Sequence, residues 1–398
     1  MKGRKKLLGD YIDILPGFAF KTKDFLDEGV PIVKIKNITP PNVSLEDLTY
    51  VSNEIAQKSE KFMLSYNDVL IAMTGSHINQ WASVVGRVAR VKYKEKSLLN
   101  QRVGKIIVKD QKKANIDYIY YFLQQDETKV MLANQAGGAA NQANISPLMI
   151  KRLEFPAPDI EVQNKIADIL SVYDELIENN QKQIKLLEEA AQRLYKEWFV
   201  DLRFPGYEQT KIIDGVPEGW RKEKLVKLVD VQYGYAFDGS LFNSEGKGVP
   251  IVRIRNIPTG ITEDFTTEKA EEQYLVSNGD IIVGMDGEFH INTWNGNTAY
   301  LVQRTCKFSP KRKIMSGWIL QAIYEPIKFF ERTVVGATVA HLGKKHIDTI
   351  ELLTGTDELY IPFSNMFEKR QSLLNQNILL KEARDRLLPK LMSGEIEV

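Results

Sequence analysis

The chain has 398 residues, of which 43% are hydrophobic, 26% charged and 10% aromatic, a composition typical of globular proteins. At roughly 100–200 residues per domain, this length predicts about two domains. The 53 basic and 52 acidic residues leave a net charge of +1, so overall charge does not indicate a nucleic-acid binder. A single cysteine, Cys306, excludes an intramolecular disulfide framework and a thiolate zinc site.

The start of the chain is basic but carries no targeting pattern. Asp10 and Asp13 occur before an apolar segment could form, so we expect no signal peptide. No stretch approaches the roughly 20 apolar residues that a membrane-spanning helix needs. We therefore expect a soluble, cytoplasmic protein.

Charge is distributed unevenly along the chain. Residues 1–158 carry 23 basic and 16 acidic side chains, a net charge of +7, whereas residues 159–203 carry 6 and 10, a net charge of −4. Residues 204–355 and 356–398 each have a net charge of −1. Clustered Lys and Arg suit an anionic partner, but a solvated surface with an uneven division of charge would give the same counts. Both interpretations stay open.

The sequence contains a long internal repeat, the kind of signal that defines an architecture. Six segments of the first half recur in the same order in the second half. The matched pairs are LGDYIDILPGFAF and LVDVQYGYAF (ending at Phe20 and Phe237), VPIVKIKNI and VPIVRIRNI (30–38 and 249–257), NDVLIAMTG and GDIIVGMDG (67–75 and 279–287), QRVGKI and QRTCKF (101–106 and 303–308), GGAANQANISPLMIKRLEF and VGATVAHLGKKHIDTIELL (137–155 and 335–353), and LLEEAAQRLYKEW and LLKEARDRLLPKL (186–198 and 379–391). The chain is therefore predicted to consist of two copies of one module.

The first part of each module has the pattern of a small α+β domain with a mostly β core. Short β-rich segments such as 32–36, 69–71 and 103–108 are separated by Gly, Pro and Asn, which predicts strands and turns. One short helix is predicted over 116–134, with its counterpart over 317–333.

The second part of each module is predicted to be one long helix. Between residues 162 and 199 there is no Gly or Pro, and apolar residues recur every three and four positions, a heptad pattern. The predicted seam comprises Leu170, Tyr173, Ile177, Asn180, Ile184, Leu187, Ala191, Leu194 and Trp198. The polar Asn180 in this seam is a device that fixes register at some cost in stability.

The second long helix, predicted over 363–392, has a weaker seam. Its members are Leu373, Asn377, Leu380, Leu387 and Leu391, and the seam is interrupted by Arg370 and Arg384. A 38-residue helix is about 57 Å long and would expose a large apolar stripe unless it found a partner. We expect the two long helices to pair with each other. We favour an antiparallel pair, with the modules at its opposite ends and an approximate two-fold axis, over a parallel pair that crowds both modules at one end.

Motifs for catalysis and metal binding are not found. The four histidines, His77, His290, His341 and His346, lack the spacing of a metal site, and neither GxxxxGK[ST] nor GxGxxG occurs. The segment Thr39-Pro40-Pro41-Asn42 lacks the leading amide and trailing ring of an amino-methyltransferase motif, so we interpret it as a turn. The carboxylates of 158–161 have no suitably placed lysine for a nuclease and suit the start of a helix instead. We predict no catalytic residue, no metal and no cofactor in this chain, and a buried, inert thiol at Cys306.

Recognition of base edges needs amide and guanidinium side chains on loops that rigid strands hold in place. Three loops per module fit this description. The candidates in the first module are Ser76, Asn79, Gln80, Arg102, Asn141, Gln142 and Asn144, and those in the second are His290, Asn292, Arg304, Thr338, His341, Lys344 and Lys345. The loop tips differ between copies while the flanking strands match. Two domains that recognise different sequences would show this difference, and so would loops that drift in any duplicated fold.

A second group of candidates is basic in both copies. Lys34 and Lys36 correspond to Arg253 and Arg255, on what is predicted to be the polar face of an alternating strand. They could contact the DNA backbone or could form a solvated strand face. Arg102 and Arg304 each follow a glutamine and could equally tie a loop through the guanidinium group.

Taken together, these motifs resemble the DNA-specificity subunit of type I restriction-modification enzymes over nearly the whole chain. The resemblance rests on the G-(F/Y)-A-F segments at 17–20 and 234–237, on the paired VPIV strands and NDVLIAMTG-type turns, and on the long helix that closes each module. The run LLEEAAQRLYKEWFVDLRFPG (186–206) is especially typical of the central helix in that family.

The resemblance implies two target-recognition domains, 1–158 and 204–355, with a central helix at 159–203 and a distal helix at 356–398. Each domain would recognise one half of a bipartite site in double-stranded DNA, and the helices would set the gap between the halves. Two modification subunits, carrying adenine methyltransferase chemistry and S-adenosylmethionine, would dock on the helices. Restriction subunits would add the ATP- and Mg-dependent motor and nuclease, in the cytoplasm of a prokaryote, and this chain would be non-catalytic. A self-sufficient DNA methyltransferase or nuclease, and a coiled-coil adaptor between proteins, are the alternatives.

Overall fold

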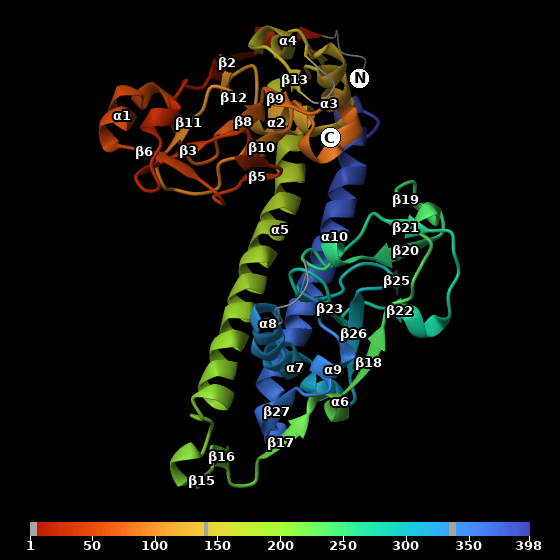
Figure 1. Ribbon diagram of the computed structural model, residues 1–398. Helices are drawn as coiled ribbons and strands as arrows, with labels where there is room; N and C mark the ends of the chain where they lie inside the picture. Colours follow the sequence, from red (N-terminus) through yellow and green to blue (C-terminus); the bar gives the residue numbers. More distant parts are fainter. Residues whose placement is uncertain (1–5, 139–141, 334–339) are drawn as a thin grey trace. The chain divides into compact units, whose positions relative to one another are not determined.

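The computed structural model describes residues 6–138, 142–333 and 340–398. The chain forms two compact units: unit 1 contains the residues up to 175 together with 380–398, and unit 2 contains residues 176–379. Both units mix strands with helices, and each includes a part of the two long helices (Figure 1). Within the described residues, no helix combines the length and apolarity required to span a bilayer.

Unit 1 is built on two main sheets. The larger sheet contains, in spatial order, β2 (Ile12–Pro16), β12 (Val103–Val108), β8 (Val69–Ala72), β10 (Val88–Arg90), β5 (Asn42–Val43) and β4 (Ile38–Thr39). The smaller sheet contains β6 (Thr49–Val51), β3 (Val30–Val33), β11 (Ser97–Leu99) and β7 (Met63–Leu64). The central strand β8 is buried on both faces because alternate side chains enter different cores. Val69 and Ile71 pack with the helices, and Leu70 and Ala72 pack against the smaller sheet.

Unit 2 repeats this architecture. Its first sheet contains β18 (Val229–Tyr233), β26 (Thr305–Pro310), β23 (Ile281–Gly284) and β24 (Ile291–Thr293). Its second contains β19 (Phe242–Asn243), β21 (Phe265–Thr266), β20 (Val249–Val252), β25 (Ala299–Leu301) and β22 (Leu275–Val276). The order β18-β26-β23-β24 matches β2-β12-β8-β10, and β20-β25-β22 matches β3-β11-β7. The predicted α+β fold with an internal repeat is therefore confirmed.

Short strand pairs and short helices complete the two units. The pairs are β1 (Lys6–Leu7) with β14 (Glu154–Phe155), β9 (Thr74–Gly75) with β13 (Ala143–Asn144), β15 (Ile212–Ile213) with β16 (Val216–Pro217), and β17 (Arg221–Lys224) with β27 (Glu351–Thr354). The short helices are α1 (Asn53–Lys58), α2 (Ile116–Gln124), α3 (Asp126–Gln135), α4 (Pro147–Lys151), α6 (Leu225–Leu228), α7 (Ser316–Ala322), α8 (Tyr324–Thr333) and α9 (Lys344–Ile347).

The single short helix predicted in each module is wrong, because each is divided into two helices. In unit 1 the break falls at Gln125, whose backbone is extended, and the acidic Asp126 then suits the N-terminus of α3. In unit 2 the break falls at Ile323, between α7 and α8. Pro326, in the first turn of α8, has no N–H with which to continue the hydrogen bonding of α7.

In the repeated segments VPIVKIKNI and VPIVRIRNI, the first four residues form a strand, β3 or β20, which ends before the basic residues. After Val33 the chain enters a 3-10 turn in which Asn37 Oδ1 accepts a hydrogen bond from Lys34 N at 3.0 Å. Asn256 Oδ1 accepts the equivalent bond from Arg253 N at 2.9 Å. These local side-chain bonds compete with the strand and end it. The prediction of a shared polar strand face is therefore wrong for the four residues Lys34, Lys36, Arg253 and Arg255.

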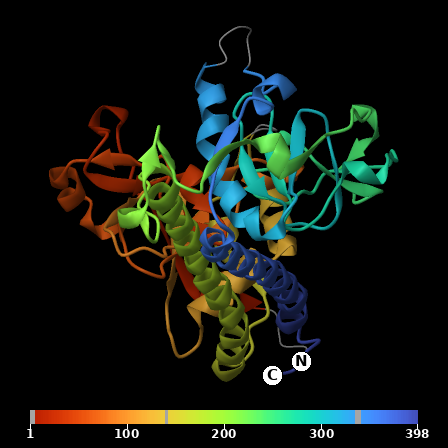
Figure 2. The ribbon, with the colours of Figure 1, turned by 90° about the horizontal axis from the view of Figure 1, so that it is seen from below.

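The long helices are α5 (Ile160–Tyr195), which continues through a π-helical turn over Lys196–Val200, and α10 (Ile361–Ser393). In unit 1, Leu170 of α5 shares a core with Leu391 of α10, and Asp174 pairs with Arg384. In unit 2, Trp198 of α5 contacts Phe363 of α10 at a ring-centroid distance of 6.2 Å. Residue numbers rise along one helix as they fall along the other, so the segments are antiparallel within each unit (Figure 2).

Every predicted seam residue is at least partly buried. The buried members are Leu170, Ile177, Asn180, Ile184, Ala191, Leu373, Asn377 and Leu391, and the half-buried ones are Tyr173, Leu187, Leu194, Trp198, Leu380 and Leu387. Arg370 and Arg384 do not break the distal seam as the sequence pattern indicates. Their side chains are only 10% and 14% exposed, and each forms an ion pair with a carboxylate of α5.

The long helices also complete the core of each unit. In unit 1, Ile166 and Leu170 pack in one cluster with Tyr118 and Phe155 of the β-rich module. In unit 2, Phe199 lies among aromatic rings from the rest of the unit: Trp220, Trp318, Tyr360 and Phe363, at centroid distances of 5.1, 5.5, 6.3 and 6.0 Å. In each unit the largest hydrophobic cluster therefore includes residues of the long helices.

Two buried asparagines meet on the helix seam of unit 2. Asn180 Nδ2 donates a hydrogen bond to Asn377 Oδ1 at 3.0 Å, and both residues are 6% exposed. We predict that Asn180→Leu lowers the free energy of unfolding by about 1–3 kcal/mol, because it leaves the Asn377 amide buried without this partner. The double variant Asn180→Leu/Asn377→Leu should recover most of the loss. Urea titration of the full chain measures both, and equal stability of the single and double variants would contradict the prediction.

The first glycine of each G-(F/Y)-A-F segment lies against the backbone of a neighbouring loop. A Cβ atom at Gly17 would lie 2.2 Å from Asn100 O, and one at Gly234 would lie 2.1 Å from Val302 O. We predict that Gly17→Ala lowers the free energy of unfolding by about 1–3 kcal/mol, as overpacking does. Gly239→Ala is a matched control, since nothing lies within 4 Å of its added Cβ and its φ is not positive. Thermal unfolding compares them, and equal midpoints would contradict this account.

Candidate nucleic-acid interface

In unit 1, three loops meet where strand β8 ends. Met73 N donates a hydrogen bond to Arg102 O at 2.9 Å, and Ile145 N donates to Met73 O at 2.9 Å. The backbone of Met73 therefore connects the chain that follows β8 with two loops distant in sequence. We call residues 73–83, 100–102 and 142–145 the first loop junction.

Unit 2 contains the same arrangement at the end of β23. Met285 N donates to Arg304 O at 2.9 Å, and Leu342 N donates to Met285 O at 2.7 Å. Residues 285–290, 302–304 and 340–342 form the second loop junction. The three loops predicted for each module thus converge at equivalent places in the two units.

The two junctions carry different side chains on the same backbone. In the first, Thr74 Oγ1 donates a hydrogen bond to Asn144 Oδ1 at 2.7 Å, a neutral pair. In the second, Asp286 and His341 occupy the equivalent backbone bridge, with His341 Nδ1 2.5 Å from Asp286 Oδ1. Arg304 Nη1 donates to the other oxygen of Asp286 at 2.5 Å. One junction is therefore uncharged at this point, whereas the other holds a carboxylate between two nitrogen-bearing side chains.

The equivalence of Asn144 and His341 also corrects the sequence alignment. The segments 137–155 and 335–353, aligned without a gap, place His341 opposite Ala143. The backbone pairs Thr74 with Asn144 and Asp286 with His341, so the alignment needs a shift of one residue.

Among the first-module candidates, Asn79, Gln80, Arg102 and Gln142 are exposed, and Asn144 is half-buried in its pair with Thr74. Ser76 is buried, and its hydroxyl donates to Gln80 O at 2.6 Å. It therefore shapes the loop and does not present its hydroxyl to a ligand. Asn141 and the second-module candidate Thr338 lie outside the described residues.

Among the second-module candidates, Arg304, His341, Lys344 and Lys345 are exposed, and His290 is half-buried with Nδ1 3.5 Å from Glu288. Asn292 lies on β24, and its side-chain amide forms hydrogen bonds within the protein. Its Nδ2 donates to Ile257 O and Pro258 O, each at 3.0 Å, and its Oδ1 accepts from Arg370 at 3.1 Å. In this arrangement the hydrogen-bonding groups of Asn292 stabilise the module, and recognition of a base by Asn292 stays a prediction.

The four repeated basic residues also interact within their own modules. Lys34 Nζ donates to Thr49 Oγ1 at 2.8 Å and lies 4.0 Å from the ring centroid of Phe25, and burial, with the nearby Lys36 charge, lowers the pKa of Lys34. Arg255 donates to both oxygens of Asp264, and Arg253 lies 5.6 Å from the ring centroid of Phe242. Lys36 is 3.9 Å from Asp47 and keeps half of its side chain exposed.

Two exposed aromatic residues, one beside the first loop junction and one within it, were not among the predicted site residues. Phe18 is 37% exposed, and its carbonyl accepts a hydrogen bond from Gln101 N at 2.9 Å. Trp81 is 40% exposed, with Lys129 Nζ 5.2 Å from its ring centroid. The predicted site residues were chosen because they carry amide or guanidinium groups, so these two aromatic side chains were not included. The signal for Phe18 is its place in the repeated G-(F/Y)-A-F segment, where Tyr235 is its counterpart.

Cys306 lies on β26 and is fully buried, and burial raises the pKa of its thiol. Across residues 6–138, 142–333 and 340–398, no three His, Cys, Asp or Glu side chains are grouped so that they could hold a metal ion.

Comparisons with known proteins bear on this pair of junctions. Residues 4–189 match the family model described as the type I restriction modification DNA specificity domain. The type I restriction enzyme MjaIX specificity subunit of Methanocaldococcus jannaschii is 26% identical over 379 residues, covering 91% of this chain and 86% of the relative. The EcoBI specificity subunit of Escherichia coli is 29% identical over 179 residues, covering 44% of this chain and 37% of the relative.

Among solved structures, the S subunit of a type I restriction-modification system from M. genitalium shares the fold. Its TM-score is 0.56 at 18% sequence identity, and the match covers 98% of this chain and 96% of that one. The sequence matches and the duplicated fold agree on one assignment. Residues 4–189 belong to the family of type I restriction modification DNA specificity domains, and over most of its length the chain is similar to the specificity subunits of type I restriction enzymes.

Proposed function

We propose that this chain determines which DNA sequence its enzyme binds, and that it carries no catalytic residues itself. In this proposal residues 1–158 and 204–355 are target-recognition domains, and each loop junction recognises one half of a bipartite site in double-stranded DNA. The observation that carries the proposal is the duplicated junction, in which one backbone arrangement holds Thr74 and Asn144 in one copy and Asp286 and His341 in the other.

The exposed side chains of the first junction have the chemistry of base recognition. Arginine pairs with guanine through two hydrogen bonds, and glutamine pairs similarly with adenine. Arg102 is exposed, so its guanidinium is available to a ligand. Gln80 and Gln142 are exposed on the two neighbouring loops. In the second junction Asp286 orients Arg304 and His341, which gives that junction a different hydrogen-bonding pattern.

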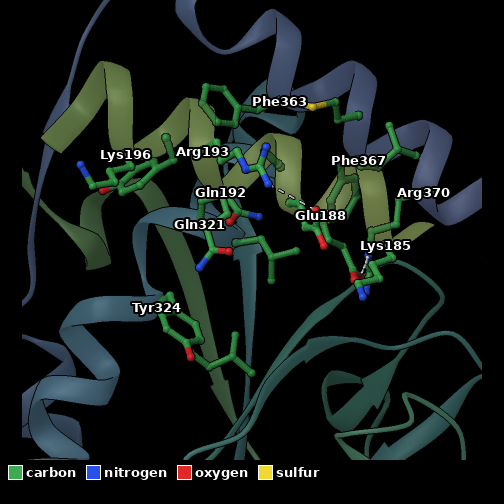
Figure 3. A pocket seen from close by; sticks show the side chains of 18 of the residues that line it. Lys185, Glu188, Gln192, Arg193, Lys196, Gln321, Tyr324, Phe363, Phe367 and Arg370 are labelled. Carbon is green, nitrogen blue, oxygen red and sulfur yellow. Dashed lines mark hydrogen bonds and ion pairs between the residues drawn. The ribbon is translucent and has the colours of Figure 1, made fainter. Parts of the chain in front are cut away.

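The central helix, 159–203, and the distal helix, 356–398, are proposed to set the gap between half-sites and to dock two modification subunits. An exposed apolar stripe on α5 supports the docking role, because such stripes mark protein contacts. Its members are Ile169 and Val172 in unit 1, and Leu176 and Leu186 in unit 2. A groove of about 730 Å³ in unit 2, between α5, α7 and α10, adds apolar surface from Val200, Tyr324 and Phe367 (Figure 3).

In this proposal the partner subunits provide all cofactors. The modification subunits bring S-adenosylmethionine and adenine methylation, and the restriction subunits bring the ATP- and Mg-dependent motor and nuclease. They would also share the phosphate contacts, which accounts for a near-neutral specificity subunit. The complex would act in the cytoplasm of a prokaryote.

The proposal predicts a discontinuous DNA motif. The chain assembled with its modification subunits should enrich, from a random oligonucleotide pool, two short sequences separated by a fixed unspecified gap. Sequencing of the bound fraction measures this enrichment. A lack of enrichment would favour a protein-protein adaptor. S-adenosylmethionine binding or Mg²⁺-dependent cleavage by the purified chain alone would favour a self-sufficient enzyme.

Within that experiment, Arg102→Ala should weaken selectivity in one half-site only. A lost bidentate contact to a base corresponds to about 1–3 kcal/mol, or roughly 5- to 150-fold in discrimination. Lys36→Ala is the control, because loss of a backbone contact lowers affinity uniformly across sequences and reduces the salt dependence. Loss of selectivity in both halves with Arg102→Ala would contradict a separate role for each junction.

The spacing role of the helices predicts a change in the gap. Insertion of one heptad after Asn180 in α5, with a matching heptad in α10, preserves the seam and adds about 10 Å of helix. The gap between enriched half-sites should lengthen by about three base pairs at 3.4 Å per base pair. Selection from the same random pool measures the gap. An unchanged gap in an assembled complex would contradict the idea that the helices act as a spacer.

A further inference from the structure

Two arginines of α10, Arg370 and Arg384, lie two heptads apart on the seam that faces α5. Both are mostly buried, and Asn377 lies midway between them. In the repeat alignment Arg384 falls on Ala191, so the first copy has no arginine at this position. A buried guanidinium is tolerated only when it is paired and hydrogen-bonded, and the partners of these two arginines connect them to different loop junctions.

In unit 1, the carboxylate of Asp174 on α5 bridges α10 and the β-rich module. Arg384 Nη1 donates to Asp174 Oδ1 at 2.6 Å, and the Tyr121 hydroxyl of α2 donates to Asp174 Oδ2 at 2.7 Å. The Tyr121 ring is fully buried in the same cluster as Ile71 and Met73, the end of β8 and the start of the first loop junction. Arg384, Asp174 and Tyr121 thus connect α10 and α5 to the hydrophobic cluster that also contains the residues at the start of that junction.

The charges of this bridge are fixed by its surroundings. Burial lowers the pKa of Arg384, but hydrogen bonds and charge from Asp174 and Asp385 outweigh it and raise the pKa above its ordinary value. Burial, followed by the Asp174 charge, raises the pKa of Tyr121. The guanidinium therefore stays charged and the phenol stays protonated at neutral pH, so both remain donors to the carboxylate.

In unit 2, Arg370 contacts the module directly. Its Nε donates to Glu188 of α5 at 2.6 Å, an ion pair seen in Figure 3. Its Nη1 donates to Thr293 Oγ1 at 2.7 Å, and its Nη2 donates to Asn292 Oδ1 at 3.1 Å. Both acceptors lie on β24, which pairs with β23 through Asn292 and Ile282. Strand β23 leads into Met285 and the second loop junction.

We propose that Arg384 and Arg370 are positioning residues, each of which fixes the orientation of one loop junction on the helix pair of its own unit. This inference rests on the proposed function, because an orientation matters only if the junctions recognise DNA. It goes beyond that function by assigning the accuracy of each half-site to a separate arginine-centred link. Base discrimination requires placement to within about 0.5 Å, which packing of long helices alone does not provide.

Two nearly isosteric substitutions each remove one link. Tyr121→Phe removes the hydroxyl that binds Asp174, and Thr293→Val removes the hydroxyl that accepts from Arg370. In the complex with modification subunits, the ratio of binding to the selected site and to single-base variants is measured for each half. Tyr121→Phe should lower this ratio about fivefold in one half and Thr293→Val about fivefold in the other half. The half affected by Tyr121→Phe should be the one affected by Arg102→Ala.

Matched controls remove buried hydroxyls that bond only within a module. The Tyr120 hydroxyl donates to Pro41 O at 3.2 Å, and Thr266 Oγ1 accepts from Glu268 N at 3.2 Å. Tyr120→Phe and Thr266→Val should leave both selectivity ratios within about twofold of the original complex. If the Tyr121 and Thr293 hydroxyls had a purely structural role, Tyr121→Phe and Thr293→Val would change the selectivity ratios no more than the two control variants do.

The outcomes separate this inference from the function on which it rests. If the original complex enriches no bipartite motif, the proposed function fails. If it does enrich one but the two link variants affect the same half, both halves or neither half, the positioning role fails. If Thr293→Val does not assemble, Arg370→Lys serves in its place, because it keeps the charge beside Glu188 but loses the fork that reaches Asn292 and Thr293.

Discussion

A helix of the length of α5, with apolar side chains every three or four residues, must bury that stripe along its whole length. No single partner does this here. Leu170 is covered by α10 together with the core of unit 1, and Phe199 is covered by Phe363 together with the aromatic rings of unit 2. The helices are therefore structural members of both modules and not separate rods. This constraint determines which residues of the modules lie against the helices and, through them, where the loop junctions are held.

The seam is not uniformly apolar, and its asparagine and arginine residues are each hydrogen-bonded to a polar residue of the other helix. Asn180 bonds to Asn377, Asp174 bonds to Arg384, and Glu188 bonds to Arg370. Each pair loses solvation when it is buried, so it contributes little to net stability compared with a hydrophobic pair of similar size. What it contributes is register: a slip along the seam would leave a buried charge or amide unpaired. The two arginine pairs extend this register to the modules, because Asp174 and Arg370 also bond to Tyr121 and to β24.

Much of the architecture was predictable because repeats and periodicity are properties of the chain itself. The duplicated module, the mostly β core and the long helices followed from matched segments and periodicity, whereas the convergence of the three loops is visible only in the hydrogen bonds of Met73 and Met285. The errors occurred where a local or distant partner decides the outcome. Asn37 ends a strand that its apolar pattern would continue. Arg370 and Arg384 similarly read as interruptions because their carboxylate partners lie on another helix.

The two loop junctions explain how one scaffold can hold different chemistry. Their shape is set by backbone groups: Met73 and Met285 each bond to two other loops through N–H and C=O, and Gly17 and Gly234 allow the neighbouring backbone to approach. None of these contacts depends on the side chain at position 74 or 286. A threonine can therefore bond to an asparagine in one copy while an aspartate holds a histidine and an arginine in the other, with the same strand pairing beneath. Because the backbone framework is independent of the exposed side chains, these side chains can change in one module without refolding either.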